Sequence, residues 1–326
     1  MFMIEIGNLK INGKVMLAPM AGVTSLAYRV FMKQFGVAIS VSEMVSDHGL
    51  VYDNKRTISY LVTDEREKPI GIQLFGSDSE TIIKAMKIVE KTGYSFDFFD
   101  INLGCPVHKV TASGAGSSLL KDPVYLEKMM KEIVESTSYP VTAKIRLGWD
   151  ENHINVRENI KALENAGVKL IGIHARTRDQ QYAGKPNFEL IRNIRDEMTV
   201  PLAISGDIFT LDDAINAMEI TKADLVMVAR GGVGKPHLVR QIETYFETGE
   251  RLEDVDIYQN VKYLLEFTKL LIEEKGEFRA MKILRGIAPK FLQYPGMKPL
   301  KVKIGSYLTT YDQLVAFLKE EGLYSE

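Results

Sequence analysis

The single cysteine of the chain lies in a setting that suits acid or nucleophilic chemistry. Cys105 belongs to the segment Asn102-Leu103-Gly104-Cys105-Pro106, which follows the apolar run from Phe96 to Ile101. An apolar run of this length indicates a buried strand, and the glycine and proline then turn the chain into a loop. A lone thiol on such a loop, next to a side-chain amide, is a candidate acid or nucleophile. A cysteine that only packs is the alternative, because free cysteines are among the most buried residues.

Two glycine-rich segments are candidates for a phosphate site. They are Ser205-Gly206-Asp207 and Ala229-Arg230-Gly231-Gly232. Glycine lets backbone N–H groups approach a ligand closely, although tight turns without a ligand use the same residue. Gly234-Lys235-Pro236 then opens a helix with proline in its first turn. A helix N-terminus favours anions, so we predict that the phosphate of a cofactor binds here.

Three polar side chains at the ends of apolar runs are candidates for cofactor contacts. An unpaired ammonium at Lys144 would be costly inside a protein, and a flavin would explain it because a cation near N1 stabilises the reduced ring. A salt bridge to Glu43 is the alternative. Gln73 can present a donor and an acceptor together to a flavin. His174 could donate to flavin or phosphate, or be a core histidine with satisfied hydrogen bonds.

Short apolar runs alternate with amphipathic stretches before residue 240. We predict strands at Val15–Ala18, Ile39–Ser42, Ile70–Leu74, Phe98–Ile101, Val141–Ile145, Leu170–Ile173, Leu202–Ile204 and Leu225–Val228. We predict helices between them at Thr81–Lys91, Val124–Ser136, Asn155–Ala166, Phe188–Met198 and Leu211–Met218. This repetition indicates an α/β fold, a (β/α)8 TIM barrel. An open doubly wound sheet is the alternative, but no Gly-x-Gly-x-x-Gly follows the first strand.

The two ends of the chain extend this barrel. Ile4–Ile6 and Leu9–Ile11 flank Gly7-Asn8 and predict a hairpin that covers the barrel floor. After a charged connector, helices are predicted at Ile257–Lys275, Phe278–Phe291 and Tyr311–Glu321. We therefore expect a barrel domain at residues 1–243 and a small all-helical domain at 244–326. In a TIM barrel the chemistry lies at the C-terminal ends of the strands, where most of the candidate residues above are found.

Composition limits the classes of function. The chain has 45% apolar and 26% charged residues, as ordinary globular proteins have. A single cysteine excludes an intramolecular disulfide and a multi-cysteine zinc site, and it fits a reducing cytoplasm. We predict no metal site, no membrane span and no obligatory protein partner. The net charge of -2 gives no global sign of a polyanionic partner, so a nucleic-acid site would have to be a local patch.

Several segments together resemble one family. They are Leu17-Ala18-Pro19-Met20-Ala21-Gly22-Val23-Thr24, Ser42-Glu43-Met44, Gln73-Leu74-Phe75-Gly76, Asn102-Leu103-Gly104-Cys105-Pro106, Lys144-Ile145-Arg146-Leu147-Gly148-Trp149, His174-Ala175-Arg176-Thr177-Arg178 and Ser205-Gly206-Asp207-Ile208. Because these segments occur together and in this order, the chain resembles the bacterial tRNA-dihydrouridine synthases. These are flavoprotein oxidoreductases that reduce specific uridines in tRNA. The resemblance runs from about Val15 to about Arg240 and continues more weakly to the C-terminus.

The resemblance implies FMN as cofactor and assigns residues to it. The residues implied to line or contact FMN are Pro19, Met20, Ala21, Gln73, Lys144 and His174. Those implied to hold its phosphate are Ser205, Gly206, Asp207, Ala229 and Arg230. The family more often has asparagine where Ser205 stands, and a hydroxyl replaces the amide there. NADPH or NADH would re-reduce the flavin, although no nicotinamide-binding motif is visible.

The resemblance also assigns roles toward the uridine. Hydride goes from reduced FMN to C6, and Cys105 protonates C5; a thiol of ordinary pKa, about 8.5, is still protonated near neutral pH. Asn102 and Arg146 are implied to hold the uracil carbonyls, and Arg178 to contact the base or a phosphate. The loop from His108 to Ser118 would carry the cysteine over the substrate, or form a fixed turn.

The C-terminal region has a segregated charge. Residues 275–303 contain eight basic residues and one acid, whereas residues 250–256 are acidic. A solvated helix face is the common explanation of such a run. We predict instead that Arg279, Lys282 and Arg285 bind the tRNA backbone, because basic stripes suit phosphates without reading sequence.

Two other functions compete with uridine reduction in tRNA. One is a dihydroorotate-type FMN barrel that acts on a free pyrimidine, which does not account for the basic tail. The other is a flavin-loaded RNA-binding module without turnover, against which Cys105, Lys144 and Asn102 argue. The sequence does not specify which uridine would be reduced.

Overall fold

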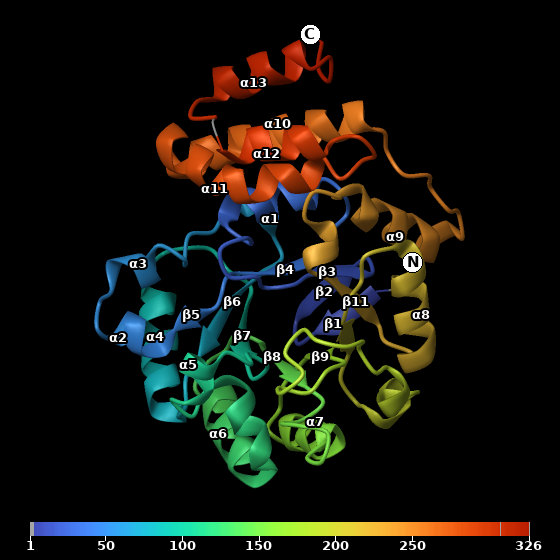
Figure 1. Ribbon diagram of the computed structural model, residues 1–326. Coiled ribbons are helices and arrows are strands. Elements are labelled where there is room, and N and C mark those ends of the chain that lie inside the picture. Colours follow the sequence, from blue (N-terminus) through green and yellow to red (C-terminus); the bar gives the residue numbers. More distant parts are fainter. Residues whose placement is uncertain (1–2, 307, 326) are drawn as a thin grey trace.

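The computed structural model describes residues 3–306 and 308–325, and a closed barrel of eight parallel strands lies at its centre (Figure 1). The strands are β3 (Val15–Leu17), β4 (Ile39–Val41), β6 (Ile70–Phe75), β7 (Phe98–Asn102), β8 (Val141–Arg146), β9 (Ile171–His174), β10 (Leu202–Ser205) and β11 (Leu225–Val228). Pairing of β4 with both β3 and β6 closes the barrel. A short additional strand, β5 (Val45–Ser46), pairs with the end of β6. The TIM barrel prediction is confirmed, and every predicted strand lies within one residue of an observed one.

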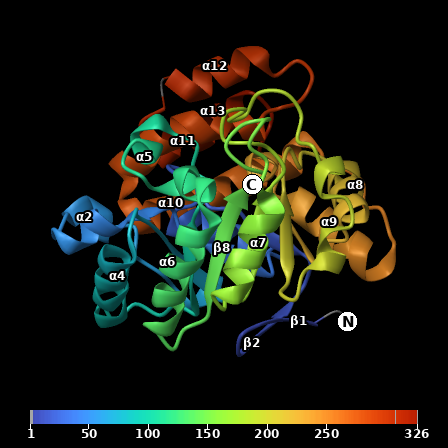
Figure 2. The ribbon, with the colours of Figure 1, turned by 90° about the horizontal axis from the view of Figure 1, so that it is seen from below.

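The predicted hairpin is also confirmed. Strands β1 (Met3–Ile6) and β2 (Leu9–Asn12) are antiparallel, and Figure 2 shows them at the end of the barrel opposite to the tip of β8. Ile4, Ile6 and Ile11 are buried in one cluster with Phe98 and Leu225 of the barrel strands. The hairpin therefore closes the floor, and the opposite mouth contains the C-terminal strand ends.

Helices surround the barrel. They are α1 (Leu26–Lys33), α2 (Asp47–Val51), α3 (Lys55–Ile58), α4 (Ser79–Lys91), α5 (His108–Thr111), α6 (Pro123–Glu135), α7 (Val156–Asn165), α8 (Leu211–Thr221) and α9 (His237–Thr248). Those predicted at Thr81–Lys91, Val124–Ser136, Asn155–Ala166 and Leu211–Met218 are confirmed as α4, α6, α7 and α8. Several begin at a capping side chain next to a strand end. Asp78 caps α4 by accepting the N–H of Thr81 at 2.8 Å, and Asp122 caps α6. These caps fix where the mouth loops end.

The helix predicted at Phe188–Met198 is wrong. The structure has two short 3-10 turns there, η3 (Glu189–Ile191) and η4 (Ile194–Glu197), separated by Asn193 with φ +54°. The left-handed conformation, which asparagine tolerates, interrupts the helix, and the N–H of Asn193 donates to Ile220 O at 2.8 Å instead. Ile191 and Ile194 are still buried, which explains why their spacing resembled that of a helix.

Four helices form the C-terminal tail: α10 (Ile257–Lys275), α11 (Glu277–Phe291), α12 (Lys298–Ser306) and α13 (Tyr311–Glu320). Helix α12 was not predicted. Helix α9 runs through the domain boundary predicted at residue 243, and the connector 249–256 separates α9 from the tail. Rings from both parts pack together: Phe31 of α1 lies 5.5 Å from Phe267 of α10, and Phe35 lies 4.9 Å from Tyr263. The tail thus shares a core with the barrel, and Figure 2 shows α12 at the same end as α5.

Within the described ranges, no helix combines the length and the apolar character that a membrane crossing requires.

Candidate active site

A hollow opens at the barrel mouth where most of the predicted cofactor residues meet. About 580 Å³ of it is free of protein atoms, and part of that space is open to solvent. The predicted residues that line it are Pro19, Met20, Lys144, His174, Ser205, Gly206, Asp207, Ala229 and Arg230. Ala21 is exposed outside this hollow, and Gln73 is buried beneath it without lining it. Strand ends separated by up to about 200 residues therefore meet at one site.

The glycine segments after β10 and β11 touch each other. A Cβ atom on Gly231 would lie 1.9 Å from the carbonyl oxygen of Ile208, and one on Gly206 would lie 2.8 Å from Cβ of Pro186. Gly206 also has φ +142°, a conformation that other residues rarely adopt. Glycine is therefore required for the two loops to come together beside the hollow.

Asp207 organises the cations at the rim of the hollow. Its carboxylate pairs with Arg176 and accepts a hydrogen bond from Arg230 Nη2 at 2.8 Å. The hydrogen bond from Arg176 is the main cause that lowers the pKa of Asp207. Because Arg176 is buried and Arg230 is exposed, Asp207 holds an exposed guanidinium close to a buried one.

Lys144 offers a positive charge to the hollow. Within the part of the chain that the structure describes, its Nζ forms no hydrogen bond or ion pair. A salt bridge between Lys144 and Glu43 was the alternative that the sequence left open. It is not formed, and the Glu43 carboxylate instead accepts the N–H of Gly22. Burial lowers the pKa of Lys144 to about 8, with a further contribution from the positive charge of Arg146. The charge of Asp100 opposes this lowering, but Asp100 forms no ion pair with Lys144, so an anionic ligand group in the hollow would find a cation that no carboxylate of the described chain contacts directly.

His174 lies beside Lys144 as a neutral ring. It is 8% exposed, and its Nε2 lies 3.4 Å from Nη1 of Arg176. Burial lowers its pKa far below the ordinary value, and the charges of Lys144, Arg146 and Arg176 act in the same direction. A neutral imidazole can donate from one nitrogen and accept at the other.

A chain of buried hydrogen bonds runs from β8 to the cysteine loop. Thr142 donates to Asp100 at 2.5 Å, and Gln73 Nε2 donates to the other oxygen of Asp100 at 2.6 Å. Asn102 Nδ2 donates to Gln73 Oε1 at 2.8 Å, and Asn102 Oδ1 accepts the N–H of Cys105 at 2.9 Å. The two amides predicted to touch ligands thus also fix the turn that carries the thiol. The sequence signalled neither Asp100 nor Thr142 as part of this network.

Cys105 is a nearly buried thiol at the edge of the site. It is 8% exposed and packs with Val110 and Ala115 of the following loop. Burial raises the pKa of the thiol, and the backbone of Val107 and the charges of Arg146 and Lys144 oppose this without cancelling it. The thiol is therefore protonated at neutral pH, as a proton donor must be.

The loop after Cys105 is folded back onto it. Ser117 donates from its N–H at 3.2 Å and from its hydroxyl at 3.0 Å to the carbonyl oxygen of Cys105. Gly116 has φ +60°, and a Cβ atom there would lie 2.9 Å from the same oxygen. The glycine thus permits the close return of the loop.

Arg146 ties two loops together from within the barrel, the one after β7 and the one after β9. Its Nε donates to Gly104 O at 2.8 Å, and its Nη1 donates to Thr177 O at 2.8 Å and Gln181 O at 2.9 Å. It is 2% exposed. Arg146 therefore holds the cysteine loop, and its Nη2 has no hydrogen-bond partner among residues 3–306 and 308–325.

Arg178 lies farther out, against an indole ring. Its guanidinium carbon is 4.4 Å from the centre of the Trp149 ring, and Nζ of Lys121 lies 3.4 Å from the same centre. Arg178 Nη2 also donates to Thr111 Oγ1 at 3.3 Å. The two cations stack on Trp149 at the rim, a cluster that the sequence did not predict beyond Arg178.

Tyr182 was missed by sequence reasoning. It lines the hollow with 57% of its surface exposed, and its ring centre lies 4.8 Å from the guanidinium carbon of Arg230. It lies in a polar loop without strand or helix periodicity, so no pattern marked it.

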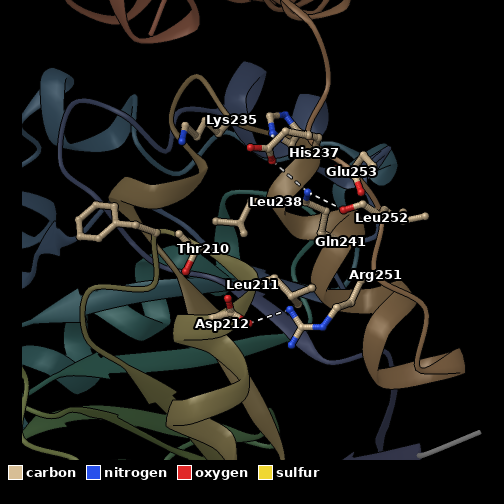
Figure 3. A pocket seen from close by; sticks show the side chains of 12 residues that line it. Thr210, Leu211, Asp212, Lys235, His237, Leu238, Gln241, Arg251, Leu252 and Glu253 are labelled. Carbon is tan, nitrogen blue, oxygen red and sulfur yellow. Dashed lines mark hydrogen bonds and ion pairs between the residues drawn. The ribbon is translucent and has the colours of Figure 1, made fainter. Parts of the chain in front are cut away.

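A second cavity, with about 790 Å³ free of protein atoms and part of that space open to solvent, lies outside the mouth between α8, α9 and the connector (Figure 3). Arg251 of the connector pairs with Asp212 at 2.7 Å, and Gln241 donates to Leu252 O at 3.0 Å. Lys235 lines this outer cavity and not the hollow, and Pro236 is the residue before α9 and not its first. These contacts fasten the connector to the barrel.

The three basic residues predicted in the tail differ in their surroundings. Arg279 and Lys282 are exposed, and Nζ of Lys282 lies 4.0 Å from the centre of the exposed Phe278 ring. Arg285 is half-buried, with Nη2 donating to Leu308 O at 3.5 Å and a buried Nε that has no partner in the described chain. Arg285 is thus packed within the tail, so Arg279 and Lys282 are the accessible pair.

Comparisons with known proteins identify the fold and the family of this chain. The structure is similar to that of an old yellow enzyme homologue from Zymomonas mobilis, with a TM-score of 0.53 and 12% sequence identity. The match covers 78% of this chain and 94% of that chain, and it shows the fold. The chain is 35% identical over 92% of its length to a probable tRNA-dihydrouridine synthase 1 from Synechocystis sp., and covers 84% of that protein. It is 29% identical to tRNA-dihydrouridine synthase B from Shewanella oneidensis, with 95% of each chain covered. The family model described as dihydrouridine synthase matches residues 16–318. The chain therefore belongs to the dihydrouridine synthase family of enzymes.

Proposed function

We propose that this enzyme reduces uridine in tRNA to 5,6-dihydrouridine with FMN as its cofactor. The observation that carries the proposal is the protonated thiol of Cys105 on the same ring of strand ends as the unpaired ammonium of Lys144. Reduction of the uracil C5=C6 bond requires a hydride and a proton. The site supplies a proton donor beside a cavity suited to an anionic redox cofactor.

The residues present fit FMN. Lys144 and Arg230 offer positive charge to the hollow, and His174 offers a neutral donor. Backbone N–H groups of the two glycine segments would hold the phosphate, with Ser205 and Arg230 beside them. Pro19, Met20 and Ala229 would form the apolar lining, and Tyr182 would cover it. We propose Gln73 and Ala21 as contacts only at the edge of the cofactor, because neither lines the hollow.

When bound, FMN would supply the hydride for C6 of the uracil, with NADPH or NADH as the source of electrons. Cys105 would transfer the proton from its Sγ to C5. The S–H bond breaks as the C5–H bond forms, and the thiolate that remains is stabilised by the charges of Arg146 and Lys144. Solvent then restores the proton.

Asn102 and Arg146 would serve the substrate in two ways. Their hydrogen bonds hold the cysteine turn, through the N–H of Cys105 and the carbonyl oxygen of Gly104. The Arg146 Nη2 group would donate to a uracil carbonyl, whereas Asn102 would orient the thiol. Arg178 would contact a phosphate next to the target base, with Lys121 and Trp149 in the same cluster.

The tail would bind the tRNA backbone. It lies at the mouth end of the barrel, and Arg279 and Lys282 are exposed on it. We place the tRNA-binding domain at residues 249–326, because α9 belongs to the barrel. Its charge suits phosphate contacts that do not read base sequence.

The test compares three substrates. NADPH oxidation is measured with unmodified tRNA, with free uracil and orotate-type pyrimidines, and with no substrate, and dihydrouridine in the tRNA is quantified. We expect NADPH oxidation coupled to dihydrouridine formation with tRNA, and no such coupled oxidation with free pyrimidines or without substrate. Turnover with free pyrimidines would favour the dihydroorotate-type alternative, and flavin binding without any turnover would favour the RNA-binding module.

A further inference from the structure

A cluster of metal-ligating side chains lies apart from the proposed flavin site. Asp47 is the first residue of α2, directly after β5, and His48 follows it. Asp78 is the residue before α4, two positions after Gly76. One donor atom from each of Asp47, His48 and Asp78 lies within 4.8 Å of the other two. The ends of two neighbouring strand segments thus bring two carboxylates and an imidazole together.

The carboxylate of Asp47 is buried, and one of its two oxygens has no hydrogen-bond partner in the described part of the chain. Asp47 is 1% exposed, and its Oδ1 accepts the N–H of His48 at 2.5 Å. Its Oδ2 is buried and has no hydrogen-bond partner in the described part of the chain. The charged groups that act on Asp47 are His48 and the like-charged Asp78. A buried carboxylate oxygen in this situation is costly unless a cation satisfies it.

The backbone leaves room for this oxygen. A Cβ atom on Gly76 would lie 2.0 Å from Oδ2 of Asp47, and the φ angle of Gly76 is not in the left-handed region. Glycine is therefore needed at position 76 for space rather than for backbone conformation. The space holds the unpartnered oxygen beside Asp78.

We propose that Asp47, His48 and Asp78 bind a divalent transition-metal ion of the zinc type. One imidazole nitrogen and two carboxylate oxygens form a donor set that suits Zn²⁺, whereas Mg²⁺ and Ca²⁺ prefer oxygen donors alone. Zinc lies about 2.0–2.2 Å from such donors, which places tetrahedral donors about 3.3–3.6 Å apart. Donor pairs near the 4.8 Å limit would therefore have to close by about 1 Å on binding. The exposed ring of His48 can turn to provide this closure.

The ion would fasten the rim of the mouth. It would join the turn after β5 to the turn after β6, where Ser77 accepts the hydroxyl of Tyr125 at 3.1 Å. A Cβ atom on Gly114 would lie 3.3 Å from Cβ of Ser77, so the loop that follows Cys105 rests on this turn. Metal binding would therefore stabilise the surface under the cysteine loop without contributing a ligand to the hollow.

The experiment measures zinc bound to the full chain after removal of metals with a chelator. Equilibrium dialysis against buffered Zn²⁺ should give one ion per chain. Asp47→Asn and His48→Gln should each weaken binding by at least about 10–100-fold, a range that is reached even by losing an outer-shell partner. Because a thiol also binds zinc, the measurement is repeated with Cys105→Ala, which should retain the ion.

The matched control is the pair His153 and Asp150, whose side chains lie 2.7 Å apart at the surface. His153→Gln should leave zinc binding unchanged. Thermal unfolding supplies a second readout: Zn²⁺ should raise the Tm of the parent and not that of Asp47→Asn. A parent chain that binds no stoichiometric zinc, or an Asp47→Asn chain that binds it as tightly, would overturn the proposal.

Discussion

The side-chain oxygen of Asn102 accepts the backbone N–H of Cys105 at 2.9 Å, while its amide nitrogen donates to Gln73. One amide thus couples the position of the thiol to the buried network of β6, β7 and β8. The proton donor is held by the barrel wall and not only by its own loop.

Replacing Asn102 with alanine tests this coupling. The N–H of Cys105 and Oε1 of Gln73 lose their partners, and each buried unsatisfied group costs about 1–3 kcal/mol. We expect lower stability in urea unfolding and slower tRNA reduction. Asn102→Asp is the comparison, because it keeps the acceptor for Cys105 and loses the donor to Gln73. Full activity in Asn102→Ala would show that the amide does not position the thiol.

Cys105→Ala tests the proton donor. The variant should retain FMN and accept hydride from NADPH, because those steps involve the hollow. Reduction of tRNA should fall by about 10²–10⁴-fold, as expected when a general acid is lost. Single-turnover measurement separates flavin reduction from tRNA reduction. A variant that reduces tRNA at the parental rate would assign the proton to another group.

Lys144→Met tests the cost of the unpaired ammonium in the flavin-free protein. The folded pKa of about 8 lies below the ordinary 10.5, so between these values the unfolded chain binds more protons and parental stability rises with pH. Below pH 8 the folded state bears the full cost. The variant should therefore exceed the parent in unfolding free energy at pH 7 by about 1–3 kcal/mol, and less at pH 10.

The control for this prediction is Lys131→Met, which removes an exposed ammonium on α6. Its difference from the parent should stay nearly constant between pH 7 and pH 10 in urea unfolding. If Lys144→Met behaves in the same way, the ammonium is solvated and not buried against the hollow.

Arg279→Ala and Lys282→Ala test the tail. Each should weaken tRNA binding and reduce the log–log salt slope by about 0.7–0.9, if each contacts one phosphate. Arg285→Ala should instead lower stability, because its guanidinium is packed against Leu308. Lys10→Ala, an exposed lysine of the floor hairpin, is the control. Equal slopes for all four variants would place tRNA binding elsewhere.

The barrel could be predicted because each strand is a short, largely buried run, and four of the eight, β7 to β10, end in a polar residue. The same periodicity failed where tertiary contacts decide the backbone, as at Asn193. Helix α12 escaped prediction for a related reason: it contains Pro299, and its contact with the core is short, made by Leu300 and Ile304.

The sequence predicted which residues lie at the strand ends of the site, but it did not predict the hydrogen-bond network that joins them. Gln73 was expected at the flavin, yet its amide lies between Asp100 and Asn102. Register brings these side chains together, since Gln73 pairs with Asp100 across β6 and β7. No local pattern in the sequence encodes that register, so the second role of the amide required the structure.

The aromatic contact between α1 and the tail has a consequence for how this molecule can be divided. Phe31 and Tyr28 of α1 lie 5.5 Å and 5.8 Å from Phe267 of α10. A chain cut after residue 248 would present these rings to water, and we expect it to aggregate. We therefore expect that the barrel does not fold stably without the tail, and that barrel and tail unfold in one cooperative transition.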